Sequence, residues 1–400
     1  MMTVPNSFSR GHRLILISGI VLLLMSLLAR WIMGGHPVYC VYKGEHHFLL
    51  FDDKPRSPSK LNEDLLKYQF NWDQLDFDFA LYPLSKIDPM SIGSSTAWQE
   101  PLSFTEQGDK KVIHLWGTVE LGRDLLAACL YGLQNSLWIG LGSILIGFFI
   151  AFPITVLSTY QSYFLRKLNI VKIFLILLGG LILVFGLYSY FVVLESQRVF
   201  SLFYSALGII SIVVGLRSSF RGVEVNWDPD RLIVMWISIF KSVPVLMMLL
   251  VFTQIVKKPS MWKLMLMIGF IIAPLLAKYI RSATRIALRQ DHVHAAVSLG
   301  LPNFNILRRY IVPRAIGEIV SVCCFLVSGV IVFESGLQFL GMGLDPAQIS
   351  LGSLLSGARQ MPSAWWAVFF PGLLISLLTA YFFYLGRVVN RDPQADIQVY

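Results

Sequence analysis

The chain has 400 residues, of which 55% are hydrophobic and only 14% are charged. A soluble domain carries about 25% charged residues, so this composition excludes an ordinary water-soluble globular protein and favours one that lies largely in a lipid bilayer. The formal net charge is +9, yet residues 35–116 hold 8 Lys or Arg against 12 Asp or Glu. Because basic loops favour the cytoplasm, this predicts one acidic extracytoplasmic loop. The charge pattern is not that of a nucleic-acid-binding protein.

Eight apolar stretches are long enough, at roughly 17–25 residues, to cross a bilayer as helices. They are residues 14–33, 135–158, 170–194, 200–216, 232–256, 262–280, 316–340 and 365–386. Arg10 and Arg13 precede the first stretch, but no small-residue cleavage pattern follows, so we expect an uncleaved signal anchor rather than a signal peptide. The sequence therefore predicts an all-α, multi-pass membrane protein with both termini in the cytoplasm.

The acidic loop opens with two runs rich in Val, Tyr and Phe on either side of Lys43-Gly44-Glu45, a pattern that predicts a β-hairpin. His46 and His47 are adjacent, so in a strand they would point to opposite faces and could not easily share a metal ion. The cysteines lack metal-binding spacing and are interpreted as small hydrophobic residues; they are Cys40, Cys129, Cys323 and Cys324. We expect no metal and no cofactor.

After the loop, apolar residues recur at helical spacing from Leu121 onward, with Arg123 and Asp124 on the opposite side. This pattern predicts an amphipathic helix that lies in the outer membrane interface before the span that begins at residue 135.

Lys241 lies about ten residues into the expected span 232–256, close to Pro244. A cation at mid-bilayer costs roughly 2.5–3.5 kcal/mol on insertion scales, so it should face protein or water. Two interpretations remain open. Lys241 could line a translocation path and meet a carboxylate, or it could snorkel or pair with Glu334 or Glu195 and hold helices together.

A polar stretch, "DHVHAAVSLGLPNFNILRRYIVP", separates two apolar runs at residues 291–313; we call it the elbow. Its first part predicts a short helix with Asp291 as the N-cap. Gly300 occupies the place where a residue with left-handed backbone ends a helix, and Pro302 cannot continue that helix.

Asn303 is positioned to cap a second helix, which Pro313 would end as the chain re-enters the bilayer. Small Ala295 and Ala296 on the first helix would let the backbone of a partner protein come close. From the residues alone the alternative is equally good: Arg308 and its neighbour could hold the elbow on anionic lipid.

Three stretches in this order resemble motifs of the membrane subunits of ATP-binding-cassette (ABC) importers. The elbow resembles their EAA loop. Residues 117–124 look like a GTDxxGRD segment, with matches at Gly117, Thr118, Gly122, Arg123 and Asp124. Residues 333–344 look like E-A-x-L-S-F-L-G-x-G, with matches at Glu334, Leu337, Phe339, Leu340, Gly341 and Gly343. Together they resemble the C-type permease of oligopeptide, dipeptide and nickel importers, and the outer loop is similar to that of the microcin-C-type branch.

The resemblance implies a type I ABC importer transmembrane domain in the bacterial inner membrane. In that family the elbow docks on an ATPase subunit and passes its closure to the membrane helices. The coupling residues implied here are His294, Ala295, Ala296, Gly300, Arg308 and Pro313; His294 stands where the family has glutamate. The implied partners are a B-type permease, two ABC ATPases and an extracytoplasmic solute-binding protein. Candidates for the translocation path or gate are Lys241, Glu334, Arg123 and Asp124.

We therefore divide the chain into six parts. They are 1–34, the N-terminus and signal anchor; 35–134, the outer loop and interfacial helix; 135–164, the first core span; 165–231, a helical hairpin that the family usually lacks; 232–390, the permease core; and 391–400, a cytoplasmic tail. No phosphate-binding G-x-x-x-x-G-K-[ST] loop occurs, so we expect no enzyme activity here and ATP hydrolysis on separate subunits. The alternatives are a secondary active transporter or a membrane scaffold that transports nothing.

Overall fold

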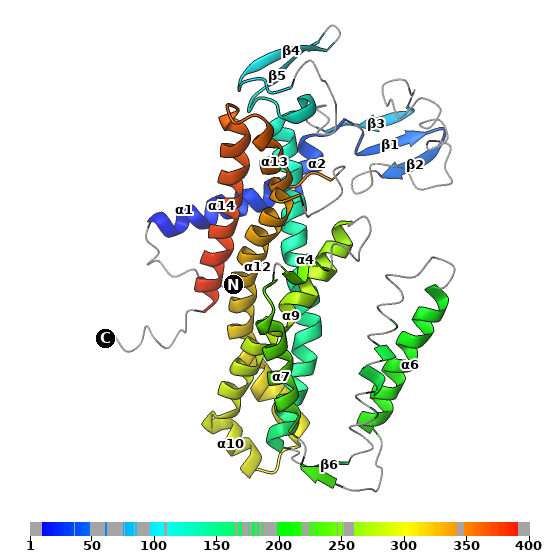
Figure 1. Ribbon diagram of the computed structural model, residues 1–400, viewed down its shortest axis with the longest axis vertical. Coiled ribbons are helices and arrows are strands. Elements are labelled where there is room, and N and C mark those ends of the chain that lie inside the picture. The colour runs from blue at the N-terminus through cyan, green and yellow to red at the C-terminus, as the bar shows by residue number, and fades with distance from the viewer. Residues whose placement is uncertain are drawn as a thin grey trace.

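The computed structural model describes residues 10–48, 75–85, 97–164, 198–217, 224–251, 260–341 and 348–390, with short gaps inside these ranges, and a few isolated pieces between them. Helices dominate, and they form an elongated bundle with the β1–β3 and β4–β5 sheets at one end (Figure 1). The elbow lies at the opposite end of the bundle. We call these the strand end and the elbow end.

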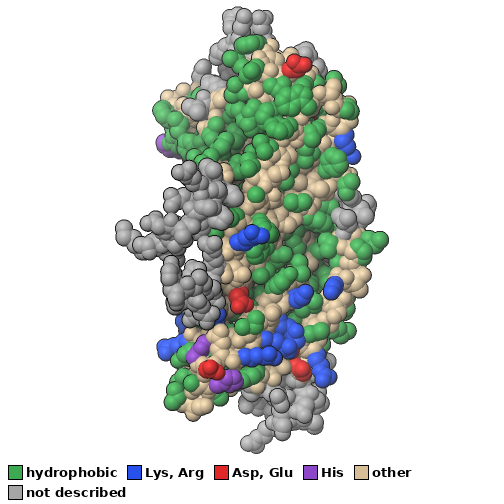
Figure 2. All heavy atoms as spheres, turned by 90° about the vertical axis from the view of Figure 1, so that its left-hand side faces the viewer, with side chains coloured by type: hydrophobic (Ala, Val, Ile, Leu, Met, Phe, Trp, Pro, Cys, Tyr) green, Lys and Arg blue, Asp and Glu red, His purple; other side chains and the backbone are tan. Residues whose placement is uncertain are grey.

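Four helices in the described residues are long and apolar enough to cross a membrane. They are α4 (Leu125–Phe164), α9 (Met261–Leu288), α12 (Val312–Phe339) and α14 (Trp365–Val389). The expected spans 135–158, 262–280, 316–340 and 365–386 coincide closely with these helices. Figure 2 shows a broad hydrophobic belt along this bundle, with Lys and Arg side chains gathered toward the elbow end. A multi-pass membrane protein is therefore confirmed.

The other expected spans are only partly represented. Helix α6 (Arg198–Arg217) covers the stretch 200–216 and lies beside the bundle in Figure 1, above a short pair of strands, β6 (Lys167–Asn169) and β7 (Glu224–Asn226). Most of residues 170–194 lies outside the described residues. The expected signal anchor is divided into α1 (Arg10–Leu27) and α2 (Ala29–Ile32), and α1 runs across the bundle in Figure 1 rather than along it.

Helix α7 (Pro229–Ser242) is shorter than the span predicted for residues 232–256. It stops because Pro244 follows: the residue before a proline is driven toward extended backbone, and Val243 has φ −102° and ψ 126°. Lys241 therefore lies exposed in the last turn of α7, not in the middle of a continuous span as predicted.

The separate interfacial helix predicted before residue 135 is wrong. Helix α4 begins at Leu125 and continues without a break, because its first turns contain good helix formers and no proline or β-branched run. The apolar residues of this first part, including Leu125, Cys129 and Leu133, are buried inside the bundle and not against lipid headgroups.

The bundle is held by close helix packing, with α4 lying along α9 as its most extensive contact. Gly269 of α9 is pressed against α4: a Cβ at this position would lie 2.8 Å from the carbonyl oxygen of Ser143. One buried apolar cluster joins α4, α9, α12 and α14 toward the strand end. A second, the elbow-end cluster, joins α4, α7, α9, the elbow and α12, and includes Val156, Ile233, Ala287, Val293 and Ile311.

The predicted β-hairpin is confirmed. Strands β1 (Tyr39–Tyr42) and β2 (Glu45–Phe48) pair antiparallel, with Cys40 opposite His47, and both turn residues, Lys43 and Gly44, have positive φ. The sheet also contains β3 (Phe79–Leu81), which pairs with β1 and was not predicted.

A second hairpin at the strand end was also missed. Strands β4 (Ser103–Gln107) and β5 (Lys110–His114) lead through a 3-10 turn (Glu120–Gly122) into α4. Between α12 and α14 lie α13 (Leu351–Gly357) and a 3-10 turn (Ala358–Gln360), on the same end of the bundle. The fold is thus mostly helical, with small sheets confined to its ends.

We predict that the strand end and the elbow end face opposite sides of the membrane. Phe104 in β4 is 65% exposed and Phe304 in the elbow is 62% exposed, so cysteine at either position is accessible to a reagent. A membrane-impermeant thiol reagent added to intact cells or spheroplasts should label Phe104→Cys and not Phe304→Cys.

The control is the unmodified chain, whose four cysteines are buried or half-buried. Labelling of both introduced cysteines from the same side would show that the predicted topology is wrong.

Candidate functional site

The first helix of the elbow, α10 (Asp291–Ser298), has one buried and one exposed face. Val293 and Ala296 point into the elbow-end cluster, while His294 and Ala295 are exposed. The predicted cap is corrected by one residue. Gln290 is the N-cap and Asp291 is the first helical residue, where its charge still favours the helix N-terminus.

Gly300 ends α10 in a left-handed conformation, with φ +71°, as predicted. Its N–H donates to the carbonyl of Val297 at 3.0 Å, and the N–H of Leu301 donates to the carbonyl of Ala296 at 3.3 Å. These two bonds form a Schellman motif, which satisfies carbonyls that the helix end would otherwise leave open. A Cβ at Gly300 would meet no atom within 4 Å, so backbone conformation and not space selects glycine here.

The second helix of the elbow, α11 (Asn303–Ile306), begins after Pro302, which is its N-cap; Asn303 is therefore helical and not a cap as predicted. The helix also does not end at Pro313. A π-helical turn (Leu307–Ile311) connects α11 directly to α12, and the N–H of Val312 donates to the carbonyl of Leu307, five residues back. The wider turn accommodates a proline that lacks an N–H, so the helix continues from residue 303 to 339.

The elbow exposes large apolar side chains at the polar end of the molecule. Leu299 is 79% exposed, Phe304 62% and Val297 43%. Arg308 is exposed on the following turn. Apolar side chains clustered in this way, with basic residues beside them, are typical of a surface that another molecule covers.

At the strand end, Asp124 acts as a structural anchor. It is buried, and its Oδ1 accepts the N–H of Ala127 at 2.9 Å, which caps α4. Its Oδ2 lies 2.8 Å from Nδ1 of His114, whose Nε2 lies 2.8 Å from Oγ1 of Thr105. Since a carboxylate only accepts, Nδ1 of His114 donates to Asp124. These successive contacts from Asp124 through His114 to Thr105 hold the β4–β5 hairpin on α4. Sequence reasoning missed His114 and Thr105, because the contact depends on an unpredicted hairpin.

Arg123 lines a cavity of about 600 Å³ at the strand end, together with Glu120, Gln338 and Arg359. Among the described residues, the buried Nε of Arg123 has no hydrogen-bond partner. Glu334, one turn before Gln338 on α12, is fully buried and accepts the hydroxyl of Ser136 on α4 at 3.0 Å. One polar contact of Glu334 is therefore with α4.

The predicted alternative in which Lys241 pairs with Glu334 is wrong within the described residues. Lys241 is exposed at the end of α7, whereas Glu334 is enclosed between α12 and α4 beside Ser136 and Ser335. Glu195, the other suggested partner, lies outside the described residues. The four candidate path residues are thus not brought into one cluster.

Residues 208–393 match the family described as "Binding-protein-dependent transport system inner membrane component". This region begins within α6 and contains α7, α9, the whole elbow, α12 and α14. The matched region is therefore similar to an inner membrane component of a binding-protein-dependent transport system. More particularly, the relatives that this chain resembles include permease proteins of oligopeptide and peptide transport systems.

Two relatives illustrate the similarity. The oligopeptide transport system permease protein OppC of Haemophilus influenzae is 29% identical over 191 residues, which are 45% of this chain and 61% of the relative. A putative peptide transport system permease protein of Brucella suis is 24% identical over 267 residues, 66% of this chain and 67% of the relative. The chain thus spans about three fifths to two thirds of the length of these relatives.

Among solved structures, a chain of the inward-facing methionine ABC transporter MetNI aligns with 66% of this chain, and 97% of that chain is covered. The sequence identity is 14% and the TM-score 0.40, a likeness that carries no structural argument.

We predict that Gly300→Ala strains the elbow by about 1 kcal/mol, because an L-residue is forced into left-handed backbone. The protein should still accumulate in the membrane, while any activity that depends on the elbow falls. The matched variant is Gly300→Asn, because asparagine tolerates this conformation better than alanine although it is larger.

The measurements are membrane abundance and the ATP hydrolysis of the assembled transport complex. If Gly300→Asn is more harmful than Gly300→Ala, side-chain size at a contact surface governs this position, and not backbone strain.

Proposed function

We propose that this chain is the C-type translocation subunit of an ATP-driven importer for oligopeptides or peptide-like compounds. It would sit in the bacterial cytoplasmic membrane with the elbow end inside the cell. A B-type permease would complete the path, two ABC ATPases would bind below, and an extracytoplasmic binding protein would deliver substrate at the strand end. ATP hydrolysis takes place on the ATPase subunits and not on this chain.

The observation that carries this proposal is the exposed apolar face of the elbow. Its inner face, with Val293 and Ala296, is fixed in the elbow-end cluster, so the elbow is part of the bundle and not a free loop. Its outer face presents Leu299 and Phe304 to the aqueous phase. A rigid helical element with an apolar outer face suits a groove on another protein.

The continuous helix from the elbow into α12 supports a coupling role. Movement of the elbow is passed on directly, because no loop lies between residue 303 and residue 339 to absorb it. Alternating access then follows from a population shift: ATP binding closes the ATPases, and the elbow biases the bundle toward one of two arrangements. His294, Ala295, Ala296, Gly300, Arg308 and Pro313 are the proposed coupling residues.

For the path, we propose that the cavity at Arg123 belongs to the extracytoplasmic gate, with Asp124 and Glu334 holding the helices around it. Support comes from the location of this cavity between the segment that precedes α4, the end of α12 and α13. Lys241 remains a proposed path residue, now at the end of α7 rather than within a span.

We predict that cysteine at Leu299 or Phe304 crosslinks to an ATPase subunit when the complete transport system is present, because both side chains project from the elbow. The matched control is Ile316→Cys, which is 41% exposed on α12 beyond the elbow and should face lipid. The readout is a crosslinked band identified by mass spectrometry.

Failure of both elbow positions to crosslink with any ATPase, in membranes that contain the whole system, would overturn the importer proposal. Crosslinks only to lipid-like probes would instead favour an elbow held on the membrane surface by Arg308.

His294 is expected to tune this contact, because the family places a carboxylate there. If the cleft of the partner is basic, His294→Glu adds a favourable charge pair and should raise ATP hydrolysis stimulated by loaded binding protein. The matched control is His292→Glu, two residues away and also exposed. Equal stimulation for the unmodified chain and His294→Glu would show that position 294 does not contact a charged group.

A further inference from the structure

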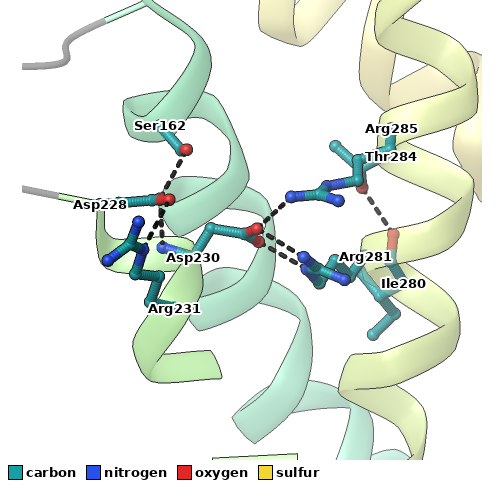
Figure 3. Close-up of polar contacts among 8 residues, drawn as sticks. All are labelled: Ser162, Asp228, Asp230, Arg231, Ile280, Arg281, Thr284 and Arg285. Carbon is teal, nitrogen blue, oxygen red and sulfur yellow. Dashed lines mark hydrogen bonds and ion pairs between the residues drawn. The ribbon is translucent and has the colours of Figure 1, made fainter. Parts of the chain in front are cut away.

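An ion cluster around a buried carboxylate lies beside the elbow, where polar contacts join three helices (Figure 3). Asp230, in the first turn of α7, is 2% exposed. Its Oδ1 accepts a hydrogen bond from Nε of Arg281 at 2.6 Å, and its Oδ2 accepts one from Nη2 of the same residue at 2.7 Å. Arg285, one turn further along α9, also donates to Oδ2. One carboxylate on α7 is therefore held by two guanidinium groups on α9.

The same turn of α7 is tied to α4. Asp228 caps α7 by accepting the N–H of Asp230 at 3.2 Å, and it accepts the hydroxyl of Ser162 on α4 at 2.7 Å. Figure 3 shows Asp228 facing α4 while Asp230 faces α9. Arg231, in contrast, is 87% exposed and only pairs loosely with Asp228 at 3.7 Å. The start of α7 is thus fastened on two sides by specific polar contacts.

The bonds to Arg281 fix orientation as well as distance. A guanidinium that donates two parallel bonds to a carboxylate holds both planes in one geometry, which a single contact does not. Burial alone would raise the pKa of Asp230, but the hydrogen bonds and charges of Arg281 and Arg285 outweigh burial and lower this pKa. Asp230 is therefore ionised at neutral pH. Sliding α7 along α9 would leave the buried carboxylate of Asp230 without its partners, so the two helices resist relative movement.

The cluster is placed where elbow movement would enter the bundle. Arg281 and Arg285 lie in the last two turns of α9, and α10 begins at Asp291. Ile233, one turn after Asp230, packs in the elbow-end cluster with residues of α9 and α10. An ionic contact and an apolar contact therefore connect α7 to the same end of α9.

We propose that Asp230, Arg281 and Arg285 form a joint that makes α7, α9 and the elbow move as one body, with Asp230 as a positioning residue for coupling. The inference rests on the proposed function, since it needs an elbow that an ATPase displaces. It assigns to α7, the helix that leads to Lys241, a share of that displacement. Without the joint, α9 would move with the elbow and leave α7 behind.

The test measures distances between spin labels in the complex purified with its own ATPase subunits, in a chain whose native cysteines are replaced by alanine. One pair joins exposed Met235 on α7 to exposed Arg289 between α9 and α10. A reference pair joins Arg289 to Phe383 on α14. We call the distance between Met235 and Arg289 the α7 distance, and the distance between Arg289 and Phe383 the reference distance. With Asp230 in place, ATP should change the reference distance and leave the α7 distance unchanged.

In Asp230→Asn, the α7 distance should change with ATP by as much as the reference distance. ATP-driven uptake should fall about tenfold, a typical size for coupling between sites, while the elbow still crosslinks to the ATPase. Arg231→Gln is the matched control and should behave as the unmodified chain. Should Asp230→Asn fail to accumulate, Arg281→Lys is the second variant. It keeps the charge but loses the pair of hydrogen bonds that the guanidinium donates to the carboxylate, and it should show the same change to a smaller degree.

Two results would overturn the joint: an α7 distance that already changes with ATP in the chain with Asp230, or one that stays fixed in both Asp230→Asn and Arg281→Lys. A reference distance that never responds to ATP, together with no elbow crosslink, would overturn the proposed function itself and the joint with it.

Discussion

The close approach of α4 and α9 is the contact on which the rest of the structure depends. In a bilayer the lipid tails are as apolar as leucine, so helices gain little by hiding apolar side chains from their surroundings. What holds them is dense packing and polar contact. Gly269 allows the backbone of α9 to lie against the carbonyl of Ser143, and the elbow-end cluster continues this contact down to α10. Both the elbow and α7 take their positions from α9.

Among the described residues, three buried carboxylates each join two elements. Glu334 joins α12 to α4 through Ser136, and Asp124 joins the β4–β5 hairpin to the start of α4 through His114. Asp230 joins α7 to α9. Because a buried polar group without a partner is costly in a medium of low dielectric constant, each contact accepts only one arrangement of its helices. These residues therefore specify how the apolar helices are oriented, which apolar packing alone leaves open.

The sequence predicted those features that depend on local properties. Span positions follow from the length of apolar runs, and the left-handed backbone of Gly300 follows from its place after a helix and before Pro302.

Features that depend on distant partners were missed. Asp230 and Arg281 lie 51 positions apart, and nothing near either residue indicates the other. The β4–β5 hairpin did leave a signal, because Gly108-Asp109 separates two runs rich in β-branched and aromatic residues. The helix end predicted at Pro313 was wrong because a π turn accommodates a residue that has no N–H to donate.

That π turn has a geometric consequence for the orientation of α12. An α-helix rotates by about 100° per residue, and a π turn contains one residue more than an α turn. The side of α12 that carries Val327, Ile331 and Glu334 into the bundle is therefore set about one residue out of phase with the buried side of the elbow. An uninterrupted α-helix through the same residues would rotate Glu334 by about 100° relative to the elbow, away from its contact with Ser136. The single extra residue beside Pro313 thus lets the buried side of the elbow and the buried side of α12 both face the bundle.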